Sequence, residues 1–136
     1  MSYSDPSLQM QKAIVAWIKH DPVIDGVPIY DAVPGNAVKP YISFGLFQAL
    51  PEHGDCLDGG EIFITLDCWA AGPDTVQIKQ LGAAVARSLD RAPIVLDYPQ
   101  RMVEMSVEQI QYMRDPDGIT AHCSITVHAF TEPTGG

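Results

Sequence analysis

The segment 61–71 constrains the fold most strongly, because its side chains alternate with the period of two that a half-buried β-strand requires. One face of this expected strand is apolar and carries Ile62, Ile64, Leu66 and Cys68. The opposite face is mixed and carries Phe63, Thr65, Asp67 and Trp69. The pattern stops at Gly72, so the strand is expected to end there.

A helix is predicted directly after this strand, from Pro73 to about Asp90. Gly72 suits a helix cap, Pro73 suits the first helical position, and Asp74 complements the N-terminal helix dipole. Apolar residues then recur at helical spacing and form one stripe: Ile78, Leu81, Val85 and Leu89. A strand and a helix joined so closely pack on each other, so we expect the other strands to assemble around this pair.

Length and charge narrow the class of protein. The chain has 136 residues, the size of one domain, and a core of that size needs no disulfide or metal. Its 17 acidic and 8 basic side chains leave a net charge of −9. The acidic excess argues against binding to a nucleic-acid backbone, which depends on cations. It is compatible with a surface that DNA slides past.

The cysteines and the N-terminus predict a soluble protein made in a cytoplasm. The three cysteines are Cys56 in an expected loop and Cys68 and Cys123 in expected strands. This odd count suggests no disulfide framework and favours a reducing compartment. Asp5 and Pro6 come too early for a secretory signal, and no apolar run reaches the roughly 18–20 residues that span a membrane.

A helix and a long connector are expected at the N-terminal end. Residues 1–4 are expected to be frayed, and Asp5 begins a helix that ends near His20. The connector 21–39 is rich in proline and glycine and contains at most a short strand at 28–30. Irregular runs of this length are often functional.

Two hairpins are expected in the rest of the chain. Segment 41–50 is apolar on both faces, which predicts a strand that is central or covered on both sides. The loop 51–60 joins it to the strand 61–71 as a projecting tip. The segment 101–113 changes phase near residues 108–109, which predicts a β-bulge. A short helical turn there is the competing interpretation.

The second hairpin closes at a turn over residues 115–118, where proline and glycine occupy turn positions. Segment 119–129 then alternates without fault and predicts the last strand. Residues 131–136 form a polar tail with no expected order in the free protein. Helix, connector, hairpin, helix and hairpin in this order predict an α+β fold, with a mostly antiparallel sheet of four to five strands packed against two helices.

The loop tip gathers plausible metal ligands: His53, Asp55, Cys56 and Asp58. Their spacing lacks the paired cysteines or histidines of a zinc site. It also lacks the alternating oxygen ligands and closing glutamate of a calcium loop. A solvated hairpin tip is therefore the favoured interpretation, with an assembly contact or a metal site as alternatives.

Two histidines share the outer face of the last strand with Ser124. His122 and His128 are separated by roughly 20 Å of strand and cannot share one metal. Ser124 lies near His122, but we find no third group to orient a catalytic triad. A polar outer face is the ordinary state of a half-buried strand, so we predict a structural role.

Asp67 lies in the middle of its expected strand and could act as a catalytic acid. The favoured interpretation is structural: Asp67 accepts hydrogen bonds from a neighbouring strand or loop, or pairs with Arg87 or Arg101. No phosphate-binding loop, dinucleotide fingerprint, nucleophile elbow or zinc-protease motif occurs in the sequence. The side chains therefore indicate a binding or assembly module, with no catalytic residue and no cofactor.

Several short sequence segments, taken in their order along the chain, resemble the tail-completion, or tail-terminator, proteins of long-tailed bacteriophages and phage-like gene transfer agents. The resemblance covers nearly the whole chain. It depends on the helix ending at Asp21-Pro22 and on these segments: Val27-Pro28-Ile29-Tyr30-Asp31, Lys39-Pro40-Tyr41-Ile42, Leu57-Asp58-Gly59, Thr65-Leu66-Asp67-Cys68-Trp69-Ala70 and Gln111-Tyr112-Met113-Arg114-Asp115-Pro116-Asp117-Gly118.

The resemblance implies a non-enzymatic virion protein at the head-proximal end of the tail. Family members form a ring, generally hexameric, that caps the tail tube, stops its polymerisation and meets the neck of the filled capsid. The implied partners are further copies of the chain, the tail tube protein and the neck or head–tail connector protein, while DNA passes through without specific binding. The resemblance implies no cofactor, no metal and no membrane.

A ring needs one patch to meet a different patch on the next copy. We expect such contacts on three polar segments that extend from the domain: the connector 21–39, the tip 52–58 and the C-terminal tail. We expect two of them to become ordered only on assembly. The candidate contact residues are Tyr30, Asp31, Glu52, His53, Asp55, Asp58, Thr131 and Glu132.

Two alternatives stay open at the level of sequence. A head–tail connector or neck protein of similar size has the same general character. A small metal-dependent enzyme that uses the 53–58 loop belongs to a different class, and stoichiometric metal in a purified monomer would favour it.

Overall fold

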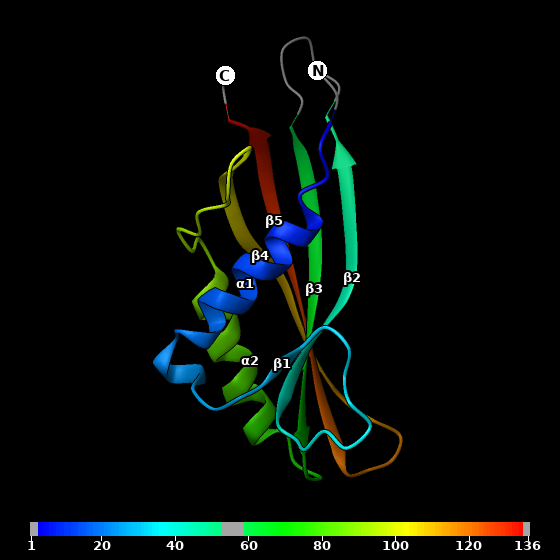
Figure 1. Ribbon diagram of the computed structural model, residues 1–136. Helices are drawn as coiled ribbons and strands as arrows, with labels where there is room; N and C mark the ends of the chain where they lie inside the picture. The colour runs from blue at the N-terminus through cyan, green and yellow to red at the C-terminus, as the bar shows by residue number, and fades with distance from the viewer. Residues whose placement is uncertain (1–2, 53–58, 135–136) are drawn as a thin grey trace.

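A computed structural model describes residues 3–52 and 59–134. Its strands form one sheet in the order β1-β2-β3-β5-β4, and only β1 and β2 pair in parallel. The predicted α+β class is therefore confirmed (Figure 1). The elements are α1 (Ser7–Lys19), the 3-10 helix η1 (Pro22–Ile24), β1 (Ile29–Tyr30), β2 (Tyr41–Pro51), β3 (Gly60–Ala71), α2 (Val76–Leu89), β4 (Gln100–Arg114) and β5 (Thr120–Pro133).

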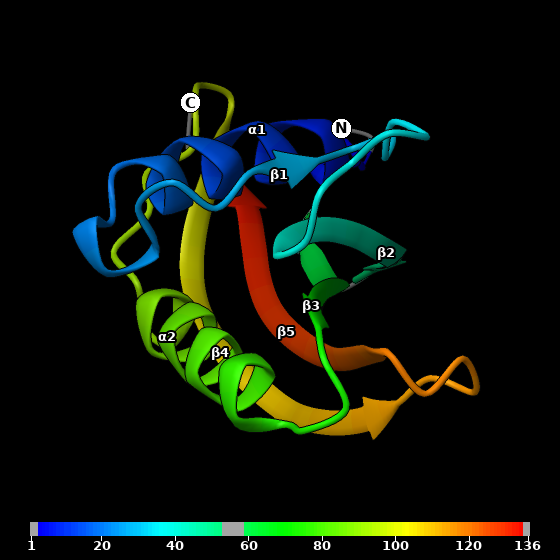
Figure 2. The same ribbon diagram turned by 90° about the horizontal axis from the view of Figure 1, so that it is seen from below.

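The centre of the sheet is the antiparallel pair β3 and β5. Their register runs without a shift from Gly60 opposite Thr131 to Ala71 opposite Thr120. Alternate residues of both strands are fully buried and share one core with the buried residues of α1 and α2. The sheet is strongly twisted, and the two helices cover one of its faces (Figure 2).

The helix α2 buries the residues that its periodicity predicted. The predicted stripe of α2 is confirmed, since its four members are at most 9% exposed. The predicted start of α2 was wrong, because the helix begins at Val76. Gly72 has φ +113° and donates its N–H to Ile119 O. At this point the backbone is therefore still hydrogen-bonded next to the turn 115–118 and is not yet helical. Asp74 then accepts the N–H of Val76.

The predicted bulge in β4 is confirmed, because the register with β5 shifts between Val107 and Gln109. This strand assignment excludes the competing helical turn. A second register shift lies between Met102 and Glu104 and was not predicted. The predicted turn is also confirmed: Gly118 has φ +72° and donates its N–H to Asp115 O.

Two predictions about strand environment were wrong. β2 is central only at residues 42–43, where β1 pairs with it; beyond them, Leu46 and Leu50 are 67% and 39% exposed. β5 continues to Pro133 because Gly60 and Gln100 provide pairing partners, so the segment from Thr131 to Pro133 is strand and not tail. No helix among the described residues is long and apolar enough to cross a membrane.

Candidate assembly surfaces

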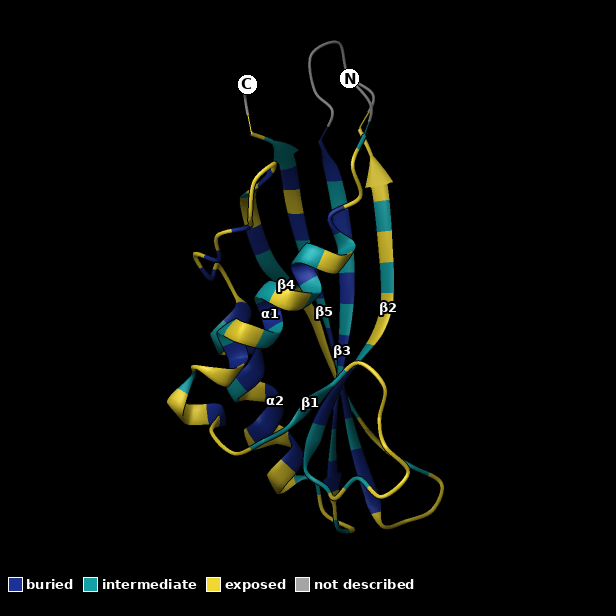
Figure 3. Ribbon diagram, viewed as in Figure 1, coloured by how far each residue is buried: buried dark blue, intermediate teal, exposed yellow. Residues whose placement is uncertain are grey.

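The face of the sheet opposite the helices is here called the open sheet face. Along β3 and β5, where side chains alternate between the two faces, it carries the polar and aromatic ones. Its residues on the two central strands are half-buried, except for the exposed Phe130, whereas their neighbours in sequence are buried in the core (Figure 3). On the two central strands the open sheet face consists of Glu61, Phe63, Thr65, Asp67, Trp69, His122, Ser124, Thr126, His128 and Phe130.

A row of aromatic rings crosses one end of the open sheet face. Tyr30 of β1 meets Tyr41 of β2 edge to face at 5.8 Å between ring centroids. Tyr41 in turn lies 6.4 Å from Trp69 of β3, which stacks on His122 of β5 at 3.9 Å. Trp69 Nε1–H also donates to Ser43 Oγ at 3.2 Å. Each ring sits on a different strand, so the row depends on the register of four strands.

Asp67 holds the histidine at the end of this row. Its Oδ1 lies 2.8 Å from Nε2 of His122, and both side chains are mostly buried. The predicted hydrogen bond from a neighbouring strand is therefore confirmed, whereas the suggested pairing with Arg87 or Arg101 was wrong. The prediction that no third group lies beside His122 and Ser124 was also wrong. Asp67, which is 55 residues away in the sequence, contacts His122 and orients its ring.

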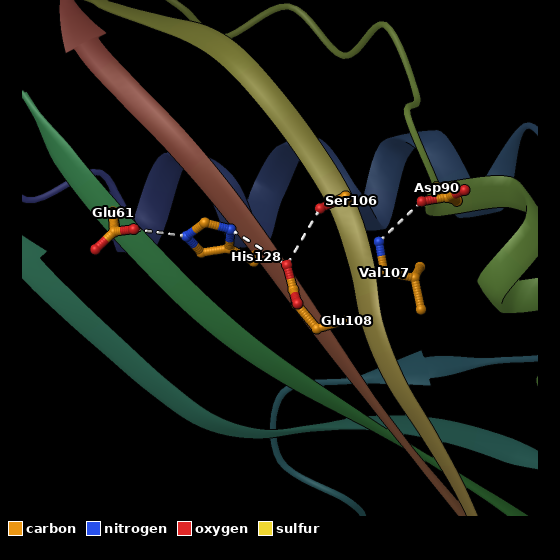
Figure 4. Close-up of polar contacts among 6 residues, drawn as sticks. All are labelled: Glu61, Asp90, Ser106, Val107, Glu108 and His128. Carbon is orange, nitrogen blue, oxygen red and sulfur yellow. Dashed lines mark hydrogen bonds and ion pairs between the residues drawn. The ribbon is translucent and has the colours of Figure 1, made fainter.

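A second histidine repeats this arrangement at the other end of the open sheet face (Figure 4). His128 stacks on Phe63 at 4.5 Å, and Phe130 meets it edge to face at 4.7 Å. Its Nε2 lies 3.1 Å from Glu61 Oε1, and its Nδ1 lies 3.5 Å from Glu108 Oε1. Two carboxylates therefore flank the imidazole of His128, one beside each ring nitrogen.

The bulge in β4 brings Glu108 to this position. Asp90, at the C-terminal end of α2, accepts the N–H of Val107 at 2.9 Å (Figure 4). Ser106 Oγ donates to Glu108 Oε1 at 3.5 Å. The helix end therefore fixes the strand where its register shifts, and the carboxylate that follows reaches His128.

These contacts do not bring together a set of metal ligands. Within residues 3–52 and 59–134, no three His, Cys, Asp or Glu side chains are arranged to hold a metal. The hydrogen bond with Cys123, together with burial, raises the pKa of the Cys68 thiol well above its usual range, which disfavours a nucleophilic thiolate at Cys68. A groove of about 510 Å³ beside β4 is lined by the connector residues 91–94 and strand residues 102–105, with no histidine, cysteine or serine among them.

The predicted contact residues have different environments. Tyr30 ends the aromatic row, and Asp31 and Glu52 are exposed. Thr131 is 4% exposed, and Glu132 pairs with Arg101 of β4. His53, Asp55 and Asp58 lie outside the described residues, as does most of the predicted tip and the alternative metal loop. The role of these residues in assembly stays a prediction.

The fold is a small α+β module whose sheet leaves one face, rich in aromatic and polar side chains, uncovered by the helices. Residues 12–132 match the family model described as "Tail completion protein gp17", and the chain belongs to this family. The resemblance seen in the sequence is thus confirmed, and the protein is a structural, tail-related virion protein and not an enzyme.

A chain of a solved structure entitled "Virion of native gene transfer agent (GTA) particle" has a similar fold. The TM-score is 0.82 at 18% sequence identity, with 93% of this chain and 96% of that chain covered. A search of curated protein sequences finds no significant match.

Proposed function

We propose that this protein forms a hexameric ring that caps the head-proximal end of a phage-like tail tube, stops tube polymerisation and joins the tail to the neck. The observation that carries the proposal is the family match over residues 12–132. The fold shared with a chain of a gene transfer agent particle supports it.

The shape of the protein suits a part that meets two different partners. The sheet is elongated, and a separate group of loops or chain ends lies at each of its two ends (Figure 1). One end carries Glu52 and Glu132, and the other carries the connector 31–40 and the turn 115–118. Lys39 Nζ donates to Thr120 Oγ1 at 2.7 Å and joins this segment to the start of β5, directly after that turn. In a ring, one end faces the tube and the other faces the neck.

The acidic surface suits a passage for DNA. With a net charge of −9, a ring of several copies repels phosphates, so the genome passes without adhesion. The proposal therefore includes DNA as a molecule in transit and not as a bound ligand.

Electron microscopy of particles made without this protein tests the proposal. We expect tail tubes of uncontrolled length that are not joined to heads, and restoration of normal tails by the wild-type chain supplied from a plasmid. Tubes of normal length that fail to join heads would assign the protein to the neck instead. Normal, head-joined tails in the deletion strain would refute both roles.

A further inference from the structure

The outer edge of β2 is open along its second half. On this side β1 pairs only with residues 42–43. No described strand pairs with the outer side of residues 45–51, a run that contains no charged side chain (Figure 1). Leu46 and Leu50 in this run are 67% and 39% exposed. An uncharged open edge presents unpaired backbone groups and is a template for a strand of another chain.

The outer edge of β4 is open only after its bulge. Before the bulge, residues 90–91 cover the edge through hydrogen bonds with the backbone of residues 105–107. On residues 108–114, no backbone group is hydrogen-bonded to a described segment other than β5. Ile110 and Met113 in this run are each 39% exposed. The sheet therefore has two open edges of equal length, and both carry exposed apolar side chains.

We propose that residues 45–51 of one copy pair with residues 108–114 of the next copy around the ring, as antiparallel strands of one continuous sheet. This inference rests on the proposed function, because it identifies the contact that makes the ring. Two different edges of one chain give a heterologous contact, the kind that closes into a ring. β2 and β4 run in opposite directions, since neighbours in the order β2-β3-β5-β4 are all antiparallel. Copies in the same orientation therefore bring the two edges together as antiparallel strands.

The backbone of β4 offers outward-pointing groups in this run. In an antiparallel pair, residues bonded to the partner strand alternate with residues whose N–H and C=O point away from it. Asp115 N–H donates to Thr120 O, so the groups of Asp115 point toward β5. By this alternation, the N–H and C=O of Ile110 and Tyr112 point away from β5 and toward another strand.

The backbone of β2 offers the matching groups. Gly72, directly after β3, donates its N–H across to β5, and the unshifted register of β3 and β5 extends this ladder. The alternation therefore turns the N–H and C=O of Phe63 toward β2, where Gln48 lies opposite. Phe47 and Ala49, on either side of Gln48, consequently point their groups away from β3.

One register pairs these outward groups and also covers exposed side chains. The facing pairs in this register are Phe47–Tyr112, Ala49–Ile110, Leu46–Met113 and Gln48–Gln111. The first two pairs exchange backbone hydrogen bonds, and the third covers two exposed apolar side chains. No like charges meet, because residues 45–51 are uncharged. This fit of backbone and side chains argues for the β4 edge of a second copy as the occupant.

The stagger of this pairing is compatible with a closed ring. Within one copy, Gln48 lies level with Ser106 through Phe63 and His128, whereas across the contact it faces Gln111. Successive copies are thus offset by five residues, or about 17 Å along the strands, over four strands that span about 19 Å. These lengths correspond to strands tilted by about 40° from the ring axis, within the range of roughly 35–45° for closed sheets.

Disulfide trapping tests the contact and its register. Gln48 and Gln111 form a non-hydrogen-bonded pair in this register, with Cα atoms about 4.5 Å apart, a separation that a disulfide bridges. The deletion strain is supplied with Gln48→Cys and Gln111→Cys combined in a Cys56→Ser chain, and its particles are oxidised with copper phenanthroline. We expect a ladder of crosslinked species that extends to six copies and collapses on reduction.

The controls are each cysteine alone and Gln48→Cys combined with Asp97→Cys, an exposed position outside both edges. None of them is expected to give a ladder. Dimers from Gln48→Cys alone would show that β2 pairs with β2, and crosslinks to a different protein only would assign the edge to another virion protein. Either result would overturn the proposal, and so would particles that contain the double variant but no crosslinks.

A backbone substitution tests the pairing without a crosslink. Ala49→Pro removes an outward N–H, and proline is tolerated on an edge strand, so the fold is expected to persist in circular dichroism and thermal unfolding. The yield of normal tails is expected to fall by at least about tenfold, because the bond is lost at every contact of the ring. Ala49→Ser is the control and is expected to leave the yield unchanged.

Normal tails from a folded Ala49→Pro chain would overturn the pairing, and the disulfide ladder decides if this variant does not fold. A deletion strain without any tail defect would instead refute the proposed function.

Discussion

Gly82→Ala separates helix propensity from tertiary packing in this protein. Gly82 lies in the middle of α2, where alanine in a solvated helix is favoured over glycine by about 1 kcal/mol. In the folded chain, however, an added Cβ lies 2.7 Å from Cys123 Sγ, 2.8 Å from Tyr112 Cε1 and 2.9 Å from Tyr112 Oη. Glycine is therefore the residue that lets α2 approach the sheet.

The packing cost is expected to exceed the gain in propensity. Cys123 is fully buried on a central strand, so its sulfur has no free space into which to move. Overpacking of a dense core typically costs about 1–3 kcal/mol, and three contacts this short place Gly82→Ala toward the upper end. After subtracting the propensity gain of about 1 kcal/mol, we expect the free energy of unfolding to fall by about 1–2 kcal/mol.

Urea unfolding followed by tryptophan fluorescence measures this change. Ala83→Gly at the neighbouring exposed position is the matched control, and it is expected to cost about 1 kcal/mol through propensity alone. In a Cys123→Ala background, Gly82→Ala is expected to cost less, because the closest atom is gone. A Gly82→Ala protein that is more stable than the wild type would refute the packing argument.

Three further predictions follow from single contacts. Ile78→Ala removes a fully buried side chain of α2 and is expected to lower the free energy of unfolding by about 2–5 kcal/mol in urea; a loss below about 1 kcal/mol would contradict its place in the core. Asp67→Asn keeps the shape of the side chain but removes the charge that faces His122; we expect a loss of about 1–2 kcal/mol by the same assay, with Asp97→Asn unchanged as control. Hydrogen bonds from the Thr120 hydroxyl and from the backbone N–H groups of Ile119 and Thr120 lower the pKa of Asp117, with Lys39 adding to the effect. Because the folded-state pKa lies below the unfolded one, this stabilisation is present above about pH 4 and is lost as pH falls through the folded-state pKa. Asp117→Asn is therefore expected to lower stability at neutral pH and to flatten its decline in acid, and an unchanged pH profile would contradict this.

The predictions that succeeded depended on local periodicity. Segment 61–71 and segment 119–129 alternate because one face of each strand is buried, and the stripe of α2 repeats because one side of that helix faces the core. The phase change near Glu108 revealed a bulge for the same reason. The order of several short sequence segments along the chain then indicated a tail-completion protein.

The contacts of the open sheet face could not be predicted, because they depend on which strands are neighbours. Asp67 meets His122, and Glu61 and Glu108 meet His128, only through the register of β3, β5 and β4. A shift of one residue in that register would turn these side chains to the other face.

The sequence by itself determined the elements, the faces they bury and the acidic character of the protein, since each of these is a property of neighbouring residues along the chain. The tertiary structure alone decided that β2 becomes an exposed edge, that β5 extends to Pro133 and that Asp67 and Glu61 of β3 lie against histidines of β5. Those features arise because segments far apart in the sequence pair with one another. The free energy of this pairing depends on the whole fold and not on neighbouring residues along the chain.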